Sequence, residues 1–244
     1  MSSQAQTLNV NAVKADFPIL KREVNNHRLV YLDSASSSQK PQAVLDAMDF
    51  HYRDHYANIH RGVYTIAEES TAAYEAARKK AARFIGAASP SELVFTKNIT
   101  EGINLVAYSW ARANLREGDV IVVSEMEHHA NIVPWHILAA ERGIELRWIP
   151  INAEFRLDLT DLESLLDGAK LLAITAMSNV LGTANDIRAL ADAAHAAGAL
   201  ILVDAAQSVP HASVDVQAWD ADFVGFTGHK MLGPSGIGGL WARA

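Results

Sequence analysis

Lys230 is the residue in this sequence best suited to act as an amine nucleophile. It closes the tetrapeptide Thr227-Gly-His-Lys230, between the apolar run 223–226 and a glycine-rich stretch at 231–239. A lysine that is buried away from water has a lowered pKa and can form a Schiff base with an aldehyde. The alternative is a surface lysine in a glycine-rich loop, which is the commoner case for this tetrapeptide taken alone.

The position of Asp204 favours a chemical role for Lys230 over that of a surface lysine. It ends the apolar run 200–203, which precedes the run that leads to Lys230. An enzyme that uses pyridoxal phosphate needs a carboxylate to keep the pyridine nitrogen protonated, so that the ring can accept electrons. An Asp and a Lys at successive strand ends could hold one such planar cofactor. Gln207 could donate a hydrogen bond to its ring oxygen, although a solvent-facing turn residue is an equal alternative.

Two further segments could bind the remaining parts of such a cofactor. Residues 98–102 open a predicted helix directly after a strand, and its free N–H groups with the Thr100 hydroxyl would suit a phosphate. An ordinary N-cap by Asn98 or Thr100 is the competing interpretation. His128 follows the run 120–124, and a neutral imidazole can stack on a ring or shuttle a proton. A buried structural histidine is the alternative; with no HExxH motif, we expect no metal site.

Short apolar runs alternate with helical patterns along the chain. The predicted strands are 93–96, 120–124, 146–151, 171–175, 200–203, 223–226 and 237–241, and the predicted helices are 41–56, 63–85, 102–114, 130–142, 160–167 and 186–197. Thr160 and Glu163 match a capping box, and Gly198 suits a helix C-terminus. This alternation, with nearly continuous apolar strands, predicts an α/β fold with a mostly parallel seven-stranded sheet and flanking helices.

Ligands of such sheets bind beyond the carboxyl ends of the strands. Polar or ionisable residues follow five of the predicted strands, at 97–102, 125–131, 177–179, 204–207 and 227–230. Loops are polar in general, so one such segment alone means little. Five of them at the same edge of the sheet predict a functional site there.

Composition limits the class of protein. The chain has 244 residues, half of them hydrophobic, and a formal net charge of −7, which suits one large globular domain or two small ones. The acidic balance argues against nucleic-acid or anionic-membrane partners. The chain has no cysteine, which excludes disulfides and thiolate chemistry by these residues and permits a reducing compartment. With a polar start unlike a secretory signal, we expect a cytoplasmic protein.

Several segments resemble one family of pyridoxal phosphate enzymes. They are Asp204-x-x-Gln207, Thr-Gly-His-Lys at 227–230, YLDSA at 31–35, NIHRG at 58–62, TEGINLVA at 100–107, MEHHANIVPW at 126–135 and SNVLGT at 178–183. Together they resemble the cysteine desulfurases of the SufS type, which include selenocysteine lyases, in the class V aminotransferase group of fold-type I enzymes.

The resemblance implies a role for each matching residue. Lys230 would form the Schiff base with the cofactor, Asp204 would pair with the pyridine nitrogen, Gln207 would face the phenolic oxygen and His128 would stack on the ring. Asn179 would hold the ring on the substrate side, Thr100, Thr227 and His229 would bind the phosphate, and His60 and Arg61 would lie at the substrate entrance. The family commonly has two threonines before Glu-Gly, whereas Ile99 stands at the first position, so one phosphate donor is expected to be missing.

The resemblance also implies a domain plan and an activity. Residues 1–25 would be an N-terminal segment and 26–244 the cofactor-binding large domain, with the C-terminal small domain, its catalytic cysteine and its carboxylate-binding arginine absent. The family converts L-cysteine or L-selenocysteine to alanine and passes the sulfur to an enzyme cysteine for iron–sulfur cluster assembly, as a homodimer with a sulfur-acceptor protein. The alternatives are a non-catalytic fragment that binds the cofactor or a partner, and another class V lyase or transferase.

Overall fold

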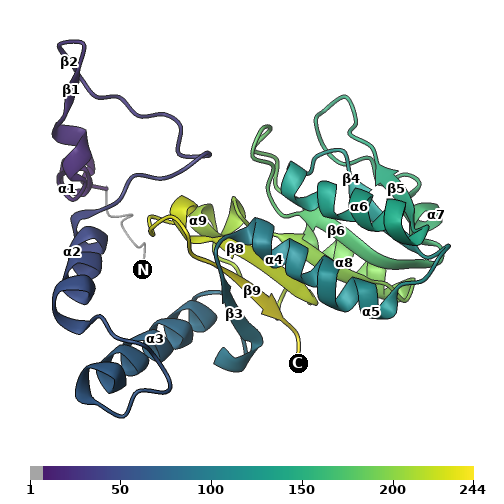
Figure 1. Cartoon of the computed structure of the whole chain (residues 1–244). Coiled ribbons are helices and arrows are strands. Elements are labelled where there is room, and N and C mark those ends of the chain that lie inside the picture. The colour runs from purple at the N-terminus through teal and green to yellow at the C-terminus, as the bar shows by residue number, and fades with distance from the viewer. Residues whose placement is uncertain (1–7) are drawn as a thin grey trace, which may run out of the picture.

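One seven-stranded sheet organises the chain (Figure 1). The computed structural model describes residues 8–244. The strands lie in the order β3-β9-β8-β7-β6-β4-β5. Their bounds are β3 Leu93–Thr96, β4 Val120–Ser124, β5 Glu145–Ile149, β6 Ala169–Thr175, β7 Leu200–Asp204, β8 Phe223–Thr227 and β9 Gly238–Ala242.

The sheet is mostly parallel. β5, β4, β6, β7 and β8 pair parallel with one another in that order, and β9 runs antiparallel to both of its neighbours, β8 and β3. Six of the seven strands therefore run in one direction and place their carboxyl ends at one edge. The predicted α/β fold with a mostly parallel seven-stranded sheet is confirmed.

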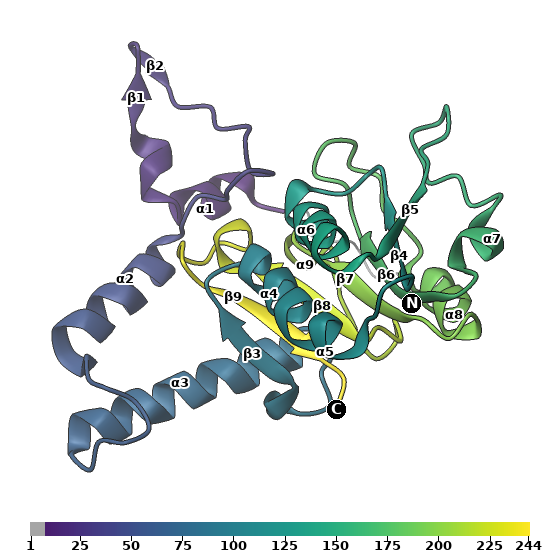
Figure 2. The same cartoon turned by 45° about the vertical axis from the view of Figure 1, so that its right-hand side comes forward.

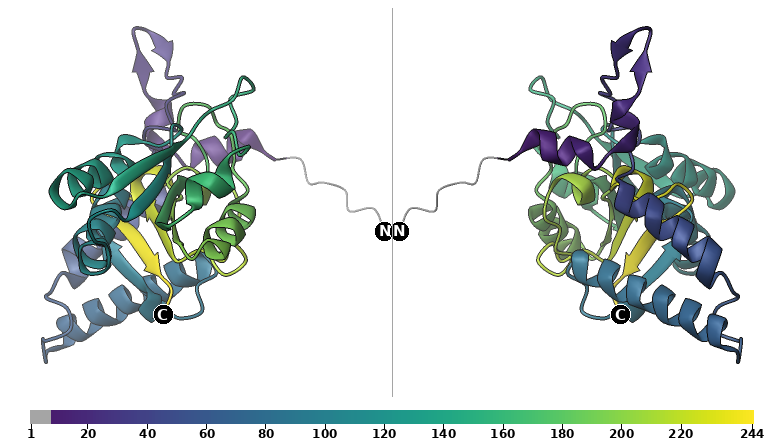
Figure 3. Two further views of the ribbon diagram at one scale, coloured as in Figure 1. Left: turned by 90° about the vertical axis from the view of Figure 1, so that its right-hand side faces the viewer. Right: turned by 90° about the vertical axis from the view of Figure 1, so that its left-hand side faces the viewer.

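Helices cover both faces of the sheet, as the nearly continuous apolar strands predict (Figure 3). Along β4, Ile121 and Val123 pack in one apolar cluster with residues of α4 and α6. Val120 and Val122 pack in a second cluster, on the opposite face, with residues of α8. Because side chains alternate between the faces of a strand, a strand that is covered on both faces must be apolar at nearly every position.

The helices that flank the sheet are close to the predicted ranges. They are α4 Ile99–Val106, which continues through η4 Ala107–Ala111 into α5 Arg112–Asn114; α6 Val133–Arg142; α7 Leu162–Leu166; α8 Ile187–Ala196; and the short α9 Ser208–His211. Short 3-10 turns are η3 Pro90–Glu92, η5 His129–Asn131 and η6 Gly228–Lys230.

Three local predictions were tested by the geometry. Gly198 has a φ of +78° just beyond α8, which confirms the predicted helix end. The capping box at Thr160 and Glu163 was wrong, because α7 begins later, at Leu162, and the Thr160 hydroxyl donates to Asp158 Oδ1 at 2.6 Å. α4 begins three residues before the predicted 102, since the Asn98 side chain caps it.

The first part of the chain, up to α2, lies away from the sheet, whereas the C-terminal half of the following helix, α3, packs against β3 (Figures 1 and 2). The elements of this N-terminal part are α1 Val10–Ala15, η1 Pro18–Lys21, the hairpin of β1 Glu23–Val24 and β2 His27–Arg28, α2 Gln42–Phe50 with its continuation η2 His51–His55, and the long α3 Thr65–Phe84. The predicted helices 41–56 and 63–85 correspond to α2 with η2 and to α3. The hairpin crosses the predicted boundary between residues 25 and 26, and residues 1–7 of the predicted N-terminal segment lie outside the described range.

None of the helices within residues 8–244 is both long and apolar enough to cross a membrane.

Gly238, the first residue of β9, packs closely against the N-cap of α4. This close contact gives the first testable prediction. A Cβ there would lie 2.7 Å from the Phe226 carbonyl oxygen and 2.8 Å from Asn98 Cα. Both are backbone atoms, so Gly238→Ala must displace β8 or the α4 cap. We expect a loss of about 1–3 kcal/mol in the free energy of unfolding, measured by urea denaturation.

Gly102→Ala is the matched control, because its Cβ would meet no atom closer than 3.5 Å and the position lies inside α4. Alanine there should leave stability unchanged or raise it by up to about 1 kcal/mol. Equal stability of Gly238→Ala and the unsubstituted chain would show that the close approach is not a constraint.

Candidate active site

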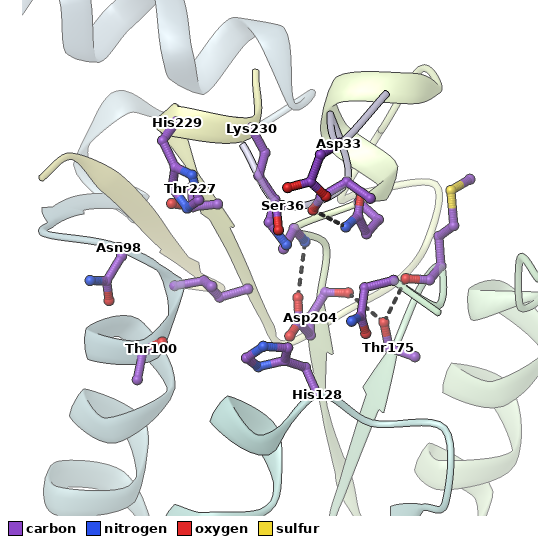
Figure 4. A pocket seen from close by; sticks show the side chains of 16 residues that line it. Asp33, Ser36, Asn98, Thr100, His128, Thr175, Asp204, Thr227, His229 and Lys230 are labelled. Atoms are coloured by element: carbon purple, nitrogen blue, oxygen red, sulfur yellow. Dashed lines mark hydrogen bonds between the residues drawn. The ribbon is translucent and has the colours of Figure 1, made fainter. Parts of the chain in front are cut away.

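A cavity of about 360 Å³ lies at the carboxyl edge of the sheet (Figure 4). Residues that end or follow β3, β4, β6, β7 and β8 line it, as the five polar segments predict. The structure brings together at this cavity all eight residues predicted to contact the cofactor, namely Thr100, His128, Asn179, Asp204, Gln207, Thr227, His229 and Lys230.

Lys230 reaches the cavity from η6, the turn directly after β8. The side chain is half-buried, and burial lowers the pKa of its ammonium group below the ordinary value, while the nearby Asp204 carboxylate opposes that shift. A lysine with a lowered pKa has a larger neutral fraction near pH 7 and is a better amine nucleophile.

Asp204 ends β7 and is only 4% exposed. Burial raises the pKa of its carboxyl group, opposed by a hydrogen bond from the Ala206 N–H and by the charges of Lys230 and His128. The Ala206 N–H donates to Oδ1 at 2.9 Å, and within residues 8–244 the other oxygen, Oδ2, accepts no hydrogen bond. Asp204 thus has an acceptor available for a cationic or N–H group of a ligand.

Thr227 carries an unsatisfied hydroxyl group. The residue is 1% exposed, and among the described residues its buried Oγ1 has no hydrogen-bond partner. Buried polar atoms in proteins nearly always have a partner, and an exception needs an explanation. Since Thr227 lines the cavity, a polar ligand there would supply the missing bond.

The start of α4 forms one side of the cavity (Figure 4). Asn98 is the N-cap, and its Oδ1 accepts from the Glu101 N–H at 2.9 Å, so the N-cap interpretation holds for Asn98. Thr100 is exposed and lines the cavity. Ile99, which replaces a possible donor, is 6% exposed and lies close to Gly225, where a Cβ would come within 2.8 Å of Ile99 Cγ1.

His128 lies near Asp204 in the cavity (Figure 4). It caps η5, and its Nδ1 accepts from the Ala130 N–H at 3.0 Å. That hydrogen bond requires an unprotonated Nδ1, so a neutral His128 carries its proton on Nε2. Over the described part of the chain, no three His, Cys, Asp or Glu side chains are grouped as metal ligands would be.

His60 and Arg61 do not line this cavity. The His60 backbone N–H donates to Thr71 Oγ1 at 2.9 Å, and its ring contacts Tyr74 with 5.6 Å between the ring centroids. Both partners belong to α3. In the structure His60 therefore packs against α3, outside the cavity. A role for His60 and Arg61 at the substrate entrance stays a prediction.

Residues 33–36, between β2 and α2, supply cavity residues to which the sequence reasoning assigned no role. Asp33, Ala35 and Ser36 line the cavity, and the Ala35 carbonyl oxygen accepts from Gln207 Nε2 at 2.7 Å. The motif YLDSA contains Asp33 and Ala35, so the resemblance marked these residues, but the sequence predicts no strand before them that would suggest a site.

Ser38 and Lys40 hold the turn that carries Lys230. The His229 carbonyl oxygen accepts from the Ser38 backbone N–H at 2.9 Å, from Ser38 Oγ at 3.0 Å and from Lys40 Nζ at 2.9 Å. Ser38 Oγ in turn accepts from the Leu232 N–H at 2.8 Å. These bonds fix the backbone on both sides of Lys230, and no local sequence pattern indicates them.

Three comparisons with known proteins agree with this geometry. The model of the aminotransferase class-V family matches residues 30–244. A cysteine desulfurase of Klebsiella pneumoniae is 55% identical over 98% of this chain, and one of Escherichia coli O1:K1 is 53% identical over 97%. This chain spans 59% of the length of both relatives.

Solved structures show the same likeness. The apo cysteine desulfurase of Thermococcus onnurineus NA1 has a TM-score of 0.90 and 40% identity, covering 100% of this chain and 58% of that one. The S-sulfonic acid form of an Escherichia coli cysteine desulfurase has a TM-score of 0.87 and 40% identity, covering 97% of this chain and 58% of that one. The chain belongs to the aminotransferase class-V family.

The interaction between Lys230 and Asp204 gives a second prediction. Because the Asp204 charge raises the pKa of Lys230, Asp204→Asn should lower that pKa further. Competitive labelling with a small acylating reagent across pH, read by mass spectrometry, should show Lys230 reacting at lower pH in the variant. Lys97, whose side chain is 80% exposed, should label identically in both chains. A shift of Lys230 to higher pH would contradict the assigned electrostatics.

Proposed function

We propose that this chain carries the cofactor-binding domain, residues 26–244, of a pyridoxal phosphate-dependent cysteine desulfurase. The observation that carries the proposal is the convergence of Lys230, Asp204 and the unsatisfied Thr227 hydroxyl on one cavity. The relatives described as cysteine desulfurases, at 53–55% identity, support this activity over other class V reactions.

The residues of the cavity fit pyridoxal phosphate. Thr227, His229 and Thr100 lie together on the side of the cavity nearest α4, where the helix start and the free Thr227 hydroxyl would hold the phosphate (Figure 4). The free Oδ2 of Asp204 would pair with the ring nitrogen, and His128 would stack on the ring. Gln207 Nε2 keeps one of its two hydrogens for the ring oxygen after donating to Ala35, and Asn179 would contact the substrate side.

Each residue then has a distinct task. When bound, pyridoxal phosphate supplies an electron-withdrawing ring that stabilises negative charge at the amino acid Cα. Lys230 Nζ, with its lowered pKa, would hold the cofactor through its aldehyde carbon and could move a proton to or from that Cα. Asp204 would keep a proton on the ring nitrogen, and His128 would hold the ring in plane.

Sulfur transfer needs a group that these 244 residues do not contain. The desulfurase reaction passes the substrate sulfur to a protein thiolate, and this sequence has no cysteine. The 244-residue chain alone should therefore bind the cofactor and form no protein persulfide. A second candidate, cofactor binding without turnover, is favoured by the same observation.

We further propose L-cysteine as the substrate, with L-selenocysteine as the alternative, in the cytoplasm and for iron–sulfur cluster assembly. The description of the relatives as cysteine desulfurases supports the first choice. We also propose a homodimer and a sulfur-acceptor protein. Exposed apolar side chains on α2 and at the start of α3 support a protein partner; Leu45, Met48, Phe50 and Ile66 are 39–57% exposed.

Borohydride reduction tests the proposed function directly. The chain is incubated with pyridoxal phosphate, reduced and digested, and the modified peptide is identified by mass spectrometry. We expect the label on Lys230 and its loss in Lys230→Ala. A label on Lys97 or Lys170 would contradict the assignment. Alanine release from L-cysteine is measured on the unreduced chain; we expect none, because these 244 residues contain no cysteine to accept the sulfur.

Thr227→Val tests the phosphate side of the cavity. Valine has the shape of threonine and removes a hydroxyl that has no partner, so the cofactor-free chain should unfold at the same or higher urea concentration. The affinity for pyridoxal phosphate should fall about ten- to a hundredfold, since a hydrogen bond to a charged group contributes about 1.5–3 kcal/mol.

Thr96→Val is the matched control. The Thr96 hydroxyl donates to the Asn98 carbonyl oxygen at 2.8 Å, so its loss should cost about 1 kcal/mol of stability in the cofactor-free chain. If Thr227→Val binds the cofactor as tightly as the unsubstituted chain, the Thr227 hydroxyl does not contact the phosphate.

A further inference from the structure

Glu127 is a buried carboxyl group beside the cavity that the proposed chemistry does not use. The residue is 9% exposed, and its side chain accepts three hydrogen bonds. Ser124 Oγ donates to Oε1 at 2.5 Å, the Thr175 backbone N–H donates to Oε1 at 2.8 Å, and Asn131 Nδ2 donates to Oε2 at 2.8 Å. Sequence reasoning assigned Glu127 no role beyond its place in the motif MEHHANIVPW.

These bonds tie together elements that are separate in the sequence. Ser124 ends β4, Thr175 ends β6 and Asn131 ends η5. Asn131 continues the network, because its Oδ1 accepts from Trp135 Nε1 of α6 at 3.0 Å, and Trp135 is fully buried. Glu127 is therefore the one residue among 8–244 that hydrogen-bonds to the ends of two strands and to η5 together.

The loop held in this way carries His128. His128 directly follows Glu127 and caps η5, and the other end of that turn is Asn131. Both sides of His128 are thus anchored to the same carboxyl group. Across the sheet, Thr175 is the register partner of Asp204, so the anchor also adjoins the strand that bears the buried aspartate.

We propose that Glu127 is a positioning residue of the site: its buried carboxyl group clamps the loop 124–131 to the ends of β4 and β6 and so holds the His128 ring beside Asp204. The link to the cofactor rests on the proposed function, whereas the clamp itself concerns only this chain's residues.

A carboxyl group is needed here because both oxygens must accept. Asn131 is fixed with Nδ2 toward Glu127, since its Oδ1 is used by Trp135. A glutamine at 127 would point its amide nitrogen either at Asn131 Nδ2 or at the Thr175 N–H, and both are donors. Glu127→Gln therefore keeps the volume of the side chain, but in either orientation the glutamine NH2 group faces another hydrogen-bond donor.

The network also accommodates a protonated Glu127. Burial raises the pKa of Glu127 to about 8, with the Asp204 charge adding to it and the three hydrogen bonds opposing it. A proton on Oε1 can be donated to the Ser124 hydroxyl, which can rotate to accept it, whereas neither amide donor can. Glu127 in this form places no second full negative charge near Asp204.

Amide hydrogen exchange of the cofactor-free chain, followed by mass spectrometry, tests the clamp. In Glu127→Gln we expect exchange to rise several-fold in peptides covering 124–135 and 175–179, and to stay unchanged in α8 and β7. The affinity for pyridoxal phosphate should fall roughly tenfold. Glu125→Gln is the matched control: Glu125 lies in the same loop, is exposed, and accepts one hydrogen bond, from the Ile151 N–H, which glutamine can also accept.

Two results would overturn the proposal: exchange and affinity that are unchanged in Glu127→Gln, or exchange that rises equally across the whole sheet. If Glu127→Gln does not fold, Ser124→Ala removes one bond of the clamp and should give the same localised increase. If the unsubstituted chain binds no pyridoxal phosphate, the proposed function is wrong, and the exchange comparison still decides whether Glu127 holds the loop.

Discussion

Burial on both faces of the parallel sheet is the constraint on which the rest of the structure depends. Strands covered by helices on both sides have no room for charged side chains along their length, so the polar groups collect where the strands end. Six strands end at one edge, and Asp204, Glu127 and Lys230 lie there, partly or wholly removed from water. The same burial raises the pKa of both carboxyl groups and lowers that of the lysine.

Groups around the cavity differ in how far the chain itself satisfies them. Asn98, His128 and Gln207 each have a hydrogen bond within the protein, which fixes their orientation. In the described part of the chain Thr227 Oγ1 has none, and the hydrogen bond to the Asp204 carboxylate goes to Oδ1, which leaves Oδ2 available. The side chains that surround the cavity are therefore already held in place, while two oxygen atoms lack a hydrogen-bond partner. Such a site is organised for a ligand, because binding then requires little loss of side-chain conformational entropy.

Residues 33–40, between β2 and α2, complete a site that the sheet alone would leave open. Ala35 and Ser38 contact Gln207 and His229 across 172 and 191 positions of the sequence, although most of the chain before them is exposed and lies away from the sheet (Figure 2). The cavity therefore depends on contacts between the two ends of the chain, and the turn that carries Lys230 is held from both the sheet side and the N-terminal side.

Local sequence determined the strands, most helices and the edge at which polar residues collect, because these follow from apolar periodicity and from residues next to each strand. It also singled out Lys230, Asp204, Gln207 and His128, each of which ends or follows a strand. It placed a capping box at Thr160, whose hydroxyl instead donates to Asp158 two residues earlier. It did not indicate Ser38, Lys40 or the role of Glu127. Those depend on which strand ends and loops meet in space, and on how completely water is excluded there. Only the tertiary structure sets these, because hydrogen bonds between distant residues and the pKa of a buried carboxyl group have no local sequence signal.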